Sequence, residues 1–91
     1  MEFLKEPGRI YHVNSQGQVD AEVTFPLDSQ GAANINHTFV DESLRGGGVA
    51  GQLLAEAAKE LRAQGLKARP TCSYAARWFE KHPEEKDLLA E

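Results

Sequence analysis

The chain has little cysteine, no long apolar run and no excess of basic residues. Its one cysteine, Cys72, excludes an internal disulfide and fits a reducing compartment. No apolar stretch approaches the roughly 20 residues of a membrane-spanning helix, so we expect no membrane partner. The segment 1–7 has no basic flank followed by an apolar run, which argues against a signal peptide. We therefore predict a cytoplasmic protein.

The charge and length narrow the function classes further. A formal net charge of −4 argues against general nucleic-acid binding, because Lys and Arg must displace the counterions of the phosphates. It does not exclude a small anionic ligand, which would meet local charge only. The 91 residues suffice for one modest core, so we predict a single domain over 1–91. The apolar share of 41% is that of an ordinary globular protein and excludes a disordered acidic tail.

The first forty residues predict an antiparallel meander of three strands. Residues 9–14 are rich in β-formers, and residues 15–18 have the composition of a hairpin turn. In 19–25 apolar residues alternate with Asp20, Glu22 and Thr24, which predicts a strand with these three side chains facing water. Residues 33–40 predict a third strand. One of its faces would carry Ile35, His37 and Phe39, and the other Asn36, Thr38 and Val40.

After residue 40 the apolar period becomes helical. Apolar residues from Val49 to Leu61 recur at helical spacing, and Gly65 is a suitable stop. Residues 66–71 predict a short strand, parallel to the strand at 33–40. Ser73 is expected to cap a second helix over 74–81, and residues 84–89 to form a last acidic turn that docks weakly. The order predicts an α+β fold, with helices packed on a mostly antiparallel sheet.

A glycine-rich turn at 45–51 precedes the first helix and is the most informative segment. Consecutive glycines let the backbone approach a ligand closely, and the N–H groups of a helix start attract an anion such as a pyrophosphate. A Walker loop is excluded because Gln52, not Lys, follows Gly51. The spelling Gly46-x-Gly48-x-x-Gly51 matches the dinucleotide fingerprint, but the meander and the length do not fit a Rossmann domain. A loop that binds no ligand is the alternative.

The pattern Arg45-x-x-Gly48-x-Ala50 resembles the pyrophosphate-binding signature of the GNAT acetyltransferases. The segments 37–50 and 70–76 together resemble the small single-domain members of that superfamily, over roughly residues 9–89. The resemblance implies the compact acyl-CoA N-acyltransferase fold, with acetyl-CoA or CoA as cofactor. The pantetheine arm would lie against a strand, and the pyrophosphate against the turn and the helix start. The cofactor-binding residues implied are Thr38, Phe39, Val40, Arg45, Gly46, Gly47, Gly48, Val49, Ala50 and, on the second helix, Tyr74.

The chain departs from the superfamily at two positions. Where typical members have an Asn and, seven residues later, a proton-donating Tyr, this sequence has Cys72 and Phe79. Phe79 has no proton to give, so the usual general acid is missing or replaced. Tyr74 is the nearest phenol in the sequence.

Cys72 and His37 are the candidate catalytic residues. The N-terminus of a helix is expected to lower the pKa of a thiol at position 72, and the resulting thiolate could accept an acyl group. The alternatives for Cys72 are a buried thiol and a passive contact with the cofactor. An imidazole at 37 would take a proton from an incoming amine, and the alternative is a structural histidine. The spacing leaves open which face of the strand meets the cofactor.

The other polar and aromatic residues carry weaker assignments. Asp20 and Glu22 are general-base candidates but fit a solvated face equally. The three histidines and Cys72 have no metal-ligand spacing, so we expect no metal. Trp78 and Phe79 fit core packing, with adenine stacking as the alternative. Candidates for the adenosine 3′-phosphate are Lys67, Arg69, Arg77 and Lys81.

Three functions remain open from the sequence. The first is an N-acetyltransferase that acts on an unidentified amine acceptor, and the second is a CoA-binding module without turnover. The third is an interaction domain whose glycine turn binds nothing. The short loops predict an open acceptor site that suits a macromolecule or a small polyamine, and the chain is expected to be a monomer or weak dimer.

Overall fold

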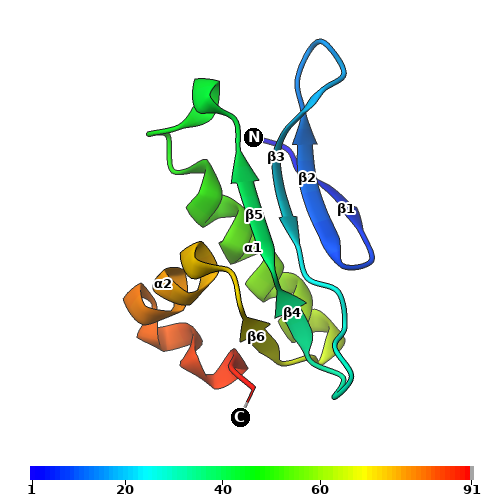
Figure 1. Ribbon diagram of the computed structural model, residues 1–91, viewed down its shortest axis with the longest axis vertical. Coiled ribbons are helices and arrows are strands. Elements are labelled where there is room, and N and C mark those ends of the chain that lie inside the picture. The colour runs from blue at the N-terminus through cyan, green and yellow to red at the C-terminus, as the bar shows by residue number, and fades with distance from the viewer. Residues whose placement is uncertain (91) are drawn as a thin grey trace.

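The computed structural model describes residues 1–90 and holds two small sheets (Figure 1). The antiparallel sheet has the order β1 (Leu4–Glu6), β2 (Arg9–Val13), β3 (Val19–Thr24) and β5 (His37–Val40). The parallel pair consists of β4 (Ala33–Ile35) and β6 (Ala68–Pro70). The helices are α1 (Val49–Gln64) and α2 (Ser73–Lys81), and two 3-10 turns are η1 (Glu42–Leu44) and η2 (Pro83–Leu88). The predicted α+β fold and the parallel pair are confirmed. Strand β1 was not predicted, because all three of its side chains are exposed and form no apolar pattern.

The single strand predicted over 33–40 is wrong, because the chain changes sheets at Asn36. Ile35 ends the strand that pairs with β6, while His37 begins the strand that pairs with β3. Both Asn36 and His37 lie opposite Thr24: the Asn36 N–H donates to the Thr24 carbonyl, and His37 is its register partner. The Thr24 hydroxyl also donates to Asn36 Oδ1. Because two residues of this strand lie opposite one residue of β3, the alternation of side chains between the two faces is reversed beyond Asn36.

A second irregularity corrects the prediction that Asp20 faces water. His12 pairs with Ala21 and Val13 pairs with Val19, so Asp20 is the extra residue of a bulge. The residue is only 6% exposed, so it does not face water. Its carboxylate oxygen Oδ1 lies 2.6 Å from Nδ1 of His12, so the buried carboxylate has a hydrogen-bond partner. The Asp20 carbonyl also accepts from the N–H of Asp41, which ties the bulge to the start of η1.

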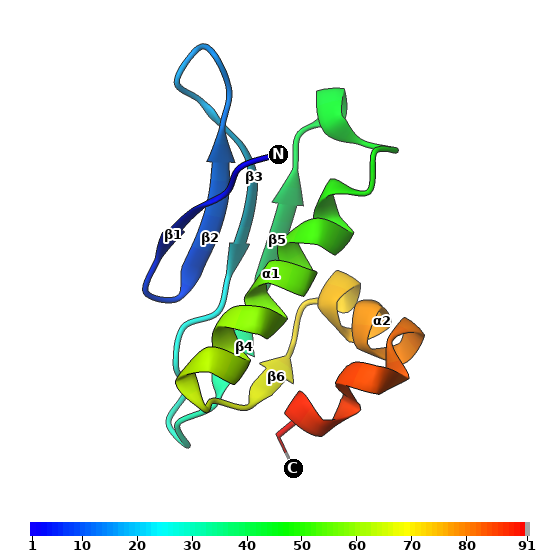
Figure 2. The same ribbon diagram turned by 180° about the vertical axis from the view of Figure 1, so that it is seen from behind.

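Helix α1 covers one face of the antiparallel sheet, as the predicted periodicity requires (Figure 2). Gly65 ends the helix in the left-handed conformation at φ 69°, as predicted. Lys5 from β1 bonds Glu56 and Glu60 on the exposed side of the helix. The buried apolar residues of α1 are Val49, Leu53, Leu54, Ala57, Ala58 and Leu61. They contribute the helix side of one continuous core.

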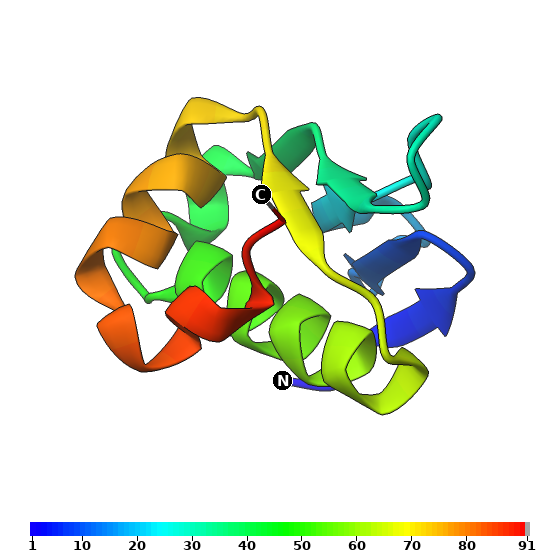
Figure 3. The same cartoon turned by 90° about the horizontal axis from the view of Figure 1, so that it is seen from below.

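The C-terminal third packs beside β6 (Figure 3). Helix α2 begins one residue earlier than predicted, so Cys72, not Ser73, is the N-cap. The last acidic segment was predicted to dock weakly, and this is wrong. Leu88 is only 4% exposed, and Arg62 of α1 bonds the carboxylates of Glu85 and Asp87. The Arg62 guanidinium lowers the pKa of Asp87 to about 2.

Candidate functional site

The glycine turn between η1 and α1 has the backbone that only glycine adopts readily. Gly46 and Gly48 have φ of 87° and 76°, and Gly48 is the N-cap of α1. A Cβ built at Gly46, Gly48 or Gly51 would meet no other atom within 4 Å. The space in front of the first helical turn is therefore open, and a ligand can approach the backbone there.

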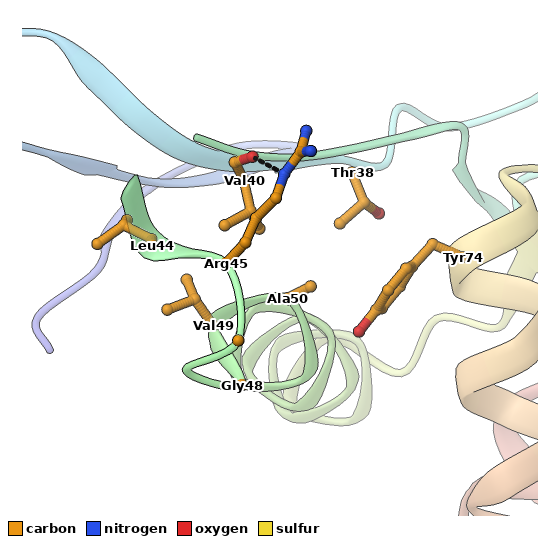
Figure 4. A pocket seen from close by; sticks show the side chains of 9 residues that line it. Thr38, Val40, Leu44, Arg45, Gly48, Val49, Ala50 and Tyr74 are labelled. Carbon is orange, nitrogen blue, oxygen red and sulfur yellow. Dashed lines mark hydrogen bonds between the residues drawn. The ribbon is translucent and has the colours of Figure 1, made fainter. Parts of the chain in front are cut away.

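A cavity of about 340 Å³ lies at this helix start (Figure 4). It combines the inner face of β5, the turn, the first residues of α1 and one side chain from α2. Its volume falls within the range of small-molecule sites. The lining residues are Thr38, Val40, Leu44, Arg45, Gly46, Gly48, Val49, Ala50 and Tyr74.

Eight of the ten residues predicted for the cofactor line this cavity. Gly47 does not, and its N–H donates to the Leu44 carbonyl. Phe39 points to the other side of β5. Leu44 is a lining residue that sequence reasoning missed; an apolar residue directly before Arg45 was the only signal.

Of the described residues that line the cavity, only Arg45 is a cation, and its position is partly fixed. Its Nε donates to the Val40 carbonyl at 3.4 Å. The described part of the chain offers the guanidinium no other hydrogen bond, and Figure 4 shows its terminal nitrogens extending past this contact. Together with the N–H groups at the start of α1, it makes the cavity suited to a phosphate-bearing ligand.

Strands β5 and β6 diverge beyond Ile35, and Cys72 lies at this divergence, next to Thr38 of the cavity. The N–H groups of Thr71 and Cys72 both donate to the Ile35 carbonyl, at 3.1 and 3.0 Å. Beyond Ile35, the edge of β5 that faces away from β3 pairs with no strand of residues 1–90. The Sγ of Cys72 reaches across to the Thr38 hydroxyl, 3.7 Å away.

Burial alone would raise the pKa of the Cys72 thiol, but several hydrogen-bond donors outweigh it. The N–H groups of Ala75 and Tyr74 at the start of α2 and the hydroxyl of Thr38 stabilise the thiolate. The net result is a pKa below the ordinary value for cysteine. Cys72 therefore has more thiolate character than a free cysteine at the same pH.

The predicted shared face of Ile35, His37 and Phe39 is wrong. Ile35 is buried, whereas His37 and Phe39 lie on the outer face of the sheet because the extra residue at Asn36 reverses the alternation. The His37 side chain is 54% exposed, with Nε2 3.8 Å from Glu22 Oε1. The structure thus brings Cys72 next to Thr38, a lining residue of the cavity, and places His37 on the opposite side of β5.

The remaining candidates separate by what they contact. Phe79 is only 5% exposed, and its ring meets Trp78 edge-on at 5.1 Å, as core packing requires. Arg69 bonds Asp28, and Lys67 bonds the Asp87 carbonyl. Of the predicted 3′-phosphate ligands, only Lys81 lines a groove, between α1 and α2, that shares Gly48 and Tyr74 with the cavity.

Membrane-spanning helices and metal-binding clusters are both missing from the part of the chain that the structure describes. No helix within residues 1–90 is long and apolar enough to cross a membrane. Over the same described residues, no group of three or more His, Cys, Asp and Glu side chains is placed to hold a metal ion.

The chain resembles several solved structures. A proposed GCN5-like N-acetyltransferase from Staphylococcus aureus has 28% identity and a TM-score of 0.80, over 98% of this chain and 87% of that one. A proposed acetyltransferase from Agrobacterium tumefaciens has 27% identity and a TM-score of 0.64, over 89% and 58%. A proposed streptothricin acetyltransferase from Bacillus anthracis, solved with acetyl coenzyme A, shares the fold at 19% identity and a TM-score of 0.61, over 86% and 49%.

Among curated protein sequences, none matches this chain. The model of the GCN5-related N-acetyl-transferase family matches residues 10–88, from the second residue of β2 to the end of η2. The match includes the glycine turn, the cavity and Cys72. The chain therefore belongs to the GCN5-related N-acetyl-transferase family.

Proposed function

We propose that the protein binds acetyl-CoA in the cavity at the start of α1 and transfers its acetyl group to an amine. One observation carries this proposal: the glycine turn, the N-terminus of α1 and the inner face of β5 all border the same cavity. Family membership supports it, as does the complex of the related fold from Bacillus anthracis with acetyl coenzyme A. The single domain over 1–91, the cytoplasmic location and the monomeric or weakly dimeric state stay predictions.

The residues present fit the parts of such a ligand. The N–H groups of the first turn of α1, which follows Gly48, and the guanidinium of Arg45 would hold the pyrophosphate. The open edge of β5, from Thr38 to Val40, would offer backbone groups to the pantetheine amides. Tyr74 forms the wall between the cavity and the groove that contains Lys81, where the adenosine part would continue.

Acetyl-CoA supplies an activated thioester, so the protein has little covalent chemistry to perform. The acetyl group passes to the amine nitrogen as the carbon–sulfur bond breaks and CoA leaves as thiolate. The chain's own part is to hold the thioester at the divergence of β5 and β6 and to take a proton from the amine. His37 is the candidate for that proton, and Tyr74 is the phenol nearest the cavity for the departing thiolate.

Cys72 has two roles to separate. As a thiolate it would accept the acetyl group itself before the amine does, or it would only contact the thioester. Mass spectrometry of the protein after incubation with acetyl-CoA distinguishes these roles. Acetylated Cys72 in the absence of an amine indicates a relay, and Cys72→Ala should then abolish turnover without changing CoA affinity.

Calorimetric titration with acetyl-CoA and with CoA tests the cofactor, and CoA release in the presence of amines tests turnover. We expect micromolar binding of acetyl-CoA. Gly48→Val should weaken it by at least about tenfold, because a β-branched residue at φ 76° is strained and fills the space before the helix. Gly17→Val is the matched control, since Gly17 has φ 79° and open space around it in the β2–β3 hairpin.

The outcomes separate the candidate functions. Equal loss of binding in the Gly48 and Gly17 variants would mean that only general strain is measured. No binding of acetyl-CoA to the wild type would overturn the proposal. Binding without turnover against any amine would favour the CoA-binding module.

A further inference from the structure

We propose that the outer face of β3 and β5 holds a binding site for the ammonium group of the acceptor, formed by Glu22, His37 and Phe39. This inference rests on the proposed acetyl transfer, and it names the class of acceptor: a primary alkylammonium at the end of a flexible chain. The cofactor cavity and this site would then lie on opposite faces of the same strand.

The strand register fixes the placement of the three side chains. Glu22 pairs directly with Phe39, and the next register pair joins Thr24 to His37. Partners in an antiparallel pair point to the same face, so all four side chains share the outer face. Thr38 pairs with Val23, which is fully buried, and so belongs to the inner face with the cavity.

The Glu22 carboxylate is held in place but keeps one oxygen for a ligand. Its Oε2 accepts from Nε of Arg9, whose guanidinium carbon lies 3.8 Å from the centre of the Tyr11 ring. Its Oε1 faces His37 Nε2 at 3.8 Å, too far for a hydrogen bond. The Glu22 side chain is 20% exposed, so it keeps contact with solvent while Arg9 holds its other oxygen.

The charges around Glu22 favour a cation. Glu6 is 3.5 Å from Arg9 and accepts from the Tyr11 hydroxyl, so the network holds two carboxylates for one guanidinium. The two carboxylates therefore carry one more negative charge than the guanidinium balances. An ammonium between Oε1 and the exposed ring of Phe39 would gain both an ion pair and a cation–π contact.

The backbone connects the outer site to the divergence of β5 and β6. His37 follows Asn36 directly, and Ile35 before it accepts the hydrogen bond from the Cys72 N–H at the divergence of β5 and β6. An ammonium must lose a proton before its nitrogen can attack, and the His37 imidazole is the neighbouring base. Figures 1 and 2 show α1 on the inner side of β5, and within residues 1–90 no helix covers the outer side.

Titration with n-butylammonium, followed by NMR of the free and the acetyl-CoA-saturated protein, tests the site. We expect the resonances of Glu22, His37 and Phe39 to shift, whereas the neutral isostere n-butanol leaves them nearly unchanged. Glu22→Gln should weaken binding about fivefold or more, and Phe39→Leu about threefold. Glu80→Gln makes the same charge change on an exposed residue of α2 and should have no effect. Spermidine and Nα-acetyl-lysine amide then show which carrier of the ammonium binds better.

Three results would overturn this inference: no shift of these resonances, equal shifts with n-butanol, or unchanged binding in both Glu22→Gln and Phe39→Leu. All three results are read on the free protein, so none of them depends on turnover or on acetyl-CoA. A failed amine site with intact acetyl-CoA binding by calorimetry would leave the proposed function standing. Loss of acetyl-CoA binding with an intact amine site would overturn the proposed function alone.

Discussion

The two faces of β5 carry candidate sites that are built in different ways. The inner site depends on backbone and space: two glycines with positive φ, the N–H groups of a helix start and one arginine. The outer site depends on charge, with a carboxylate fixed by Arg9 between an imidazole and an aromatic ring. A ligand that is mostly phosphate and amide suits the first, and a small cation suits the second.

The largest expected effect comes from removing the residue that separates the faces. Deleting Asn36 shortens the chain where it passes from the pairing with β6 to the pairing with β3, so one of these two pairings must shift by a residue. The shift turns either Ile35, or Thr38 and Val40, away from the buried face. We expect the free energy of unfolding to fall by about 3 kcal/mol or more, measured by urea denaturation. Asn36→Ser keeps the residue count and should cost about 1 kcal/mol or less. A deletion variant with wild-type stability would contradict this account of the two faces.

Charge-neutralising variants on the two faces should each weaken the binding of one ligand and leave the other unchanged. Arg45→Gln removes the cation of the inner site, and we expect acetyl-CoA affinity to fall about tenfold while n-butylammonium binding is unchanged. Glu22→Gln should weaken n-butylammonium binding and leave acetyl-CoA affinity unchanged. Calorimetry and NMR titration on the same protein samples measure both. If either variant lowers both affinities, the two sites are not independent.

Much of the fold was predictable because its signals are local. The apolar period of α1, the hairpin between β2 and β3 and the stop at Gly65 each need only neighbouring residues. The extra residues at Asp20 and Asn36 were not predictable, because either could continue its strand and only the pairing with the next strand reveals it. The assignments of faces failed at these two positions.

The candidate site likewise has a part that local sequence predicts and a part that it does not. The glycine turn is a contiguous motif, and the structure gathers most of its predicted residues around one cavity. The contacts that decide the remaining candidates are long-range. Arg69 meets Asp28, Cys72 meets Thr38, and Glu22 meets both Arg9 and His37. No spacing within the sequence indicates these pairs.

The smallest expected effect is on the thiol that lies where the inner site ends. Hydrogen-bond donors at the start of α2 and the Thr38 hydroxyl lower the pKa of Cys72. The rate of its alkylation by iodoacetamide should therefore reach half its maximum at a lower pH than the rate for a cysteine in an unstructured peptide. Thr38→Val removes one donor, so the alkylation profile should move to higher pH, whereas Thr38→Ser keeps the hydroxyl and should leave it in place. Glu22→Gln, on the outer face, should not move the profile. A profile that follows Glu22 and not Thr38 would mean that the charge of the outer face reaches the thiol through the sheet, and the two faces would then act as one electrostatic site.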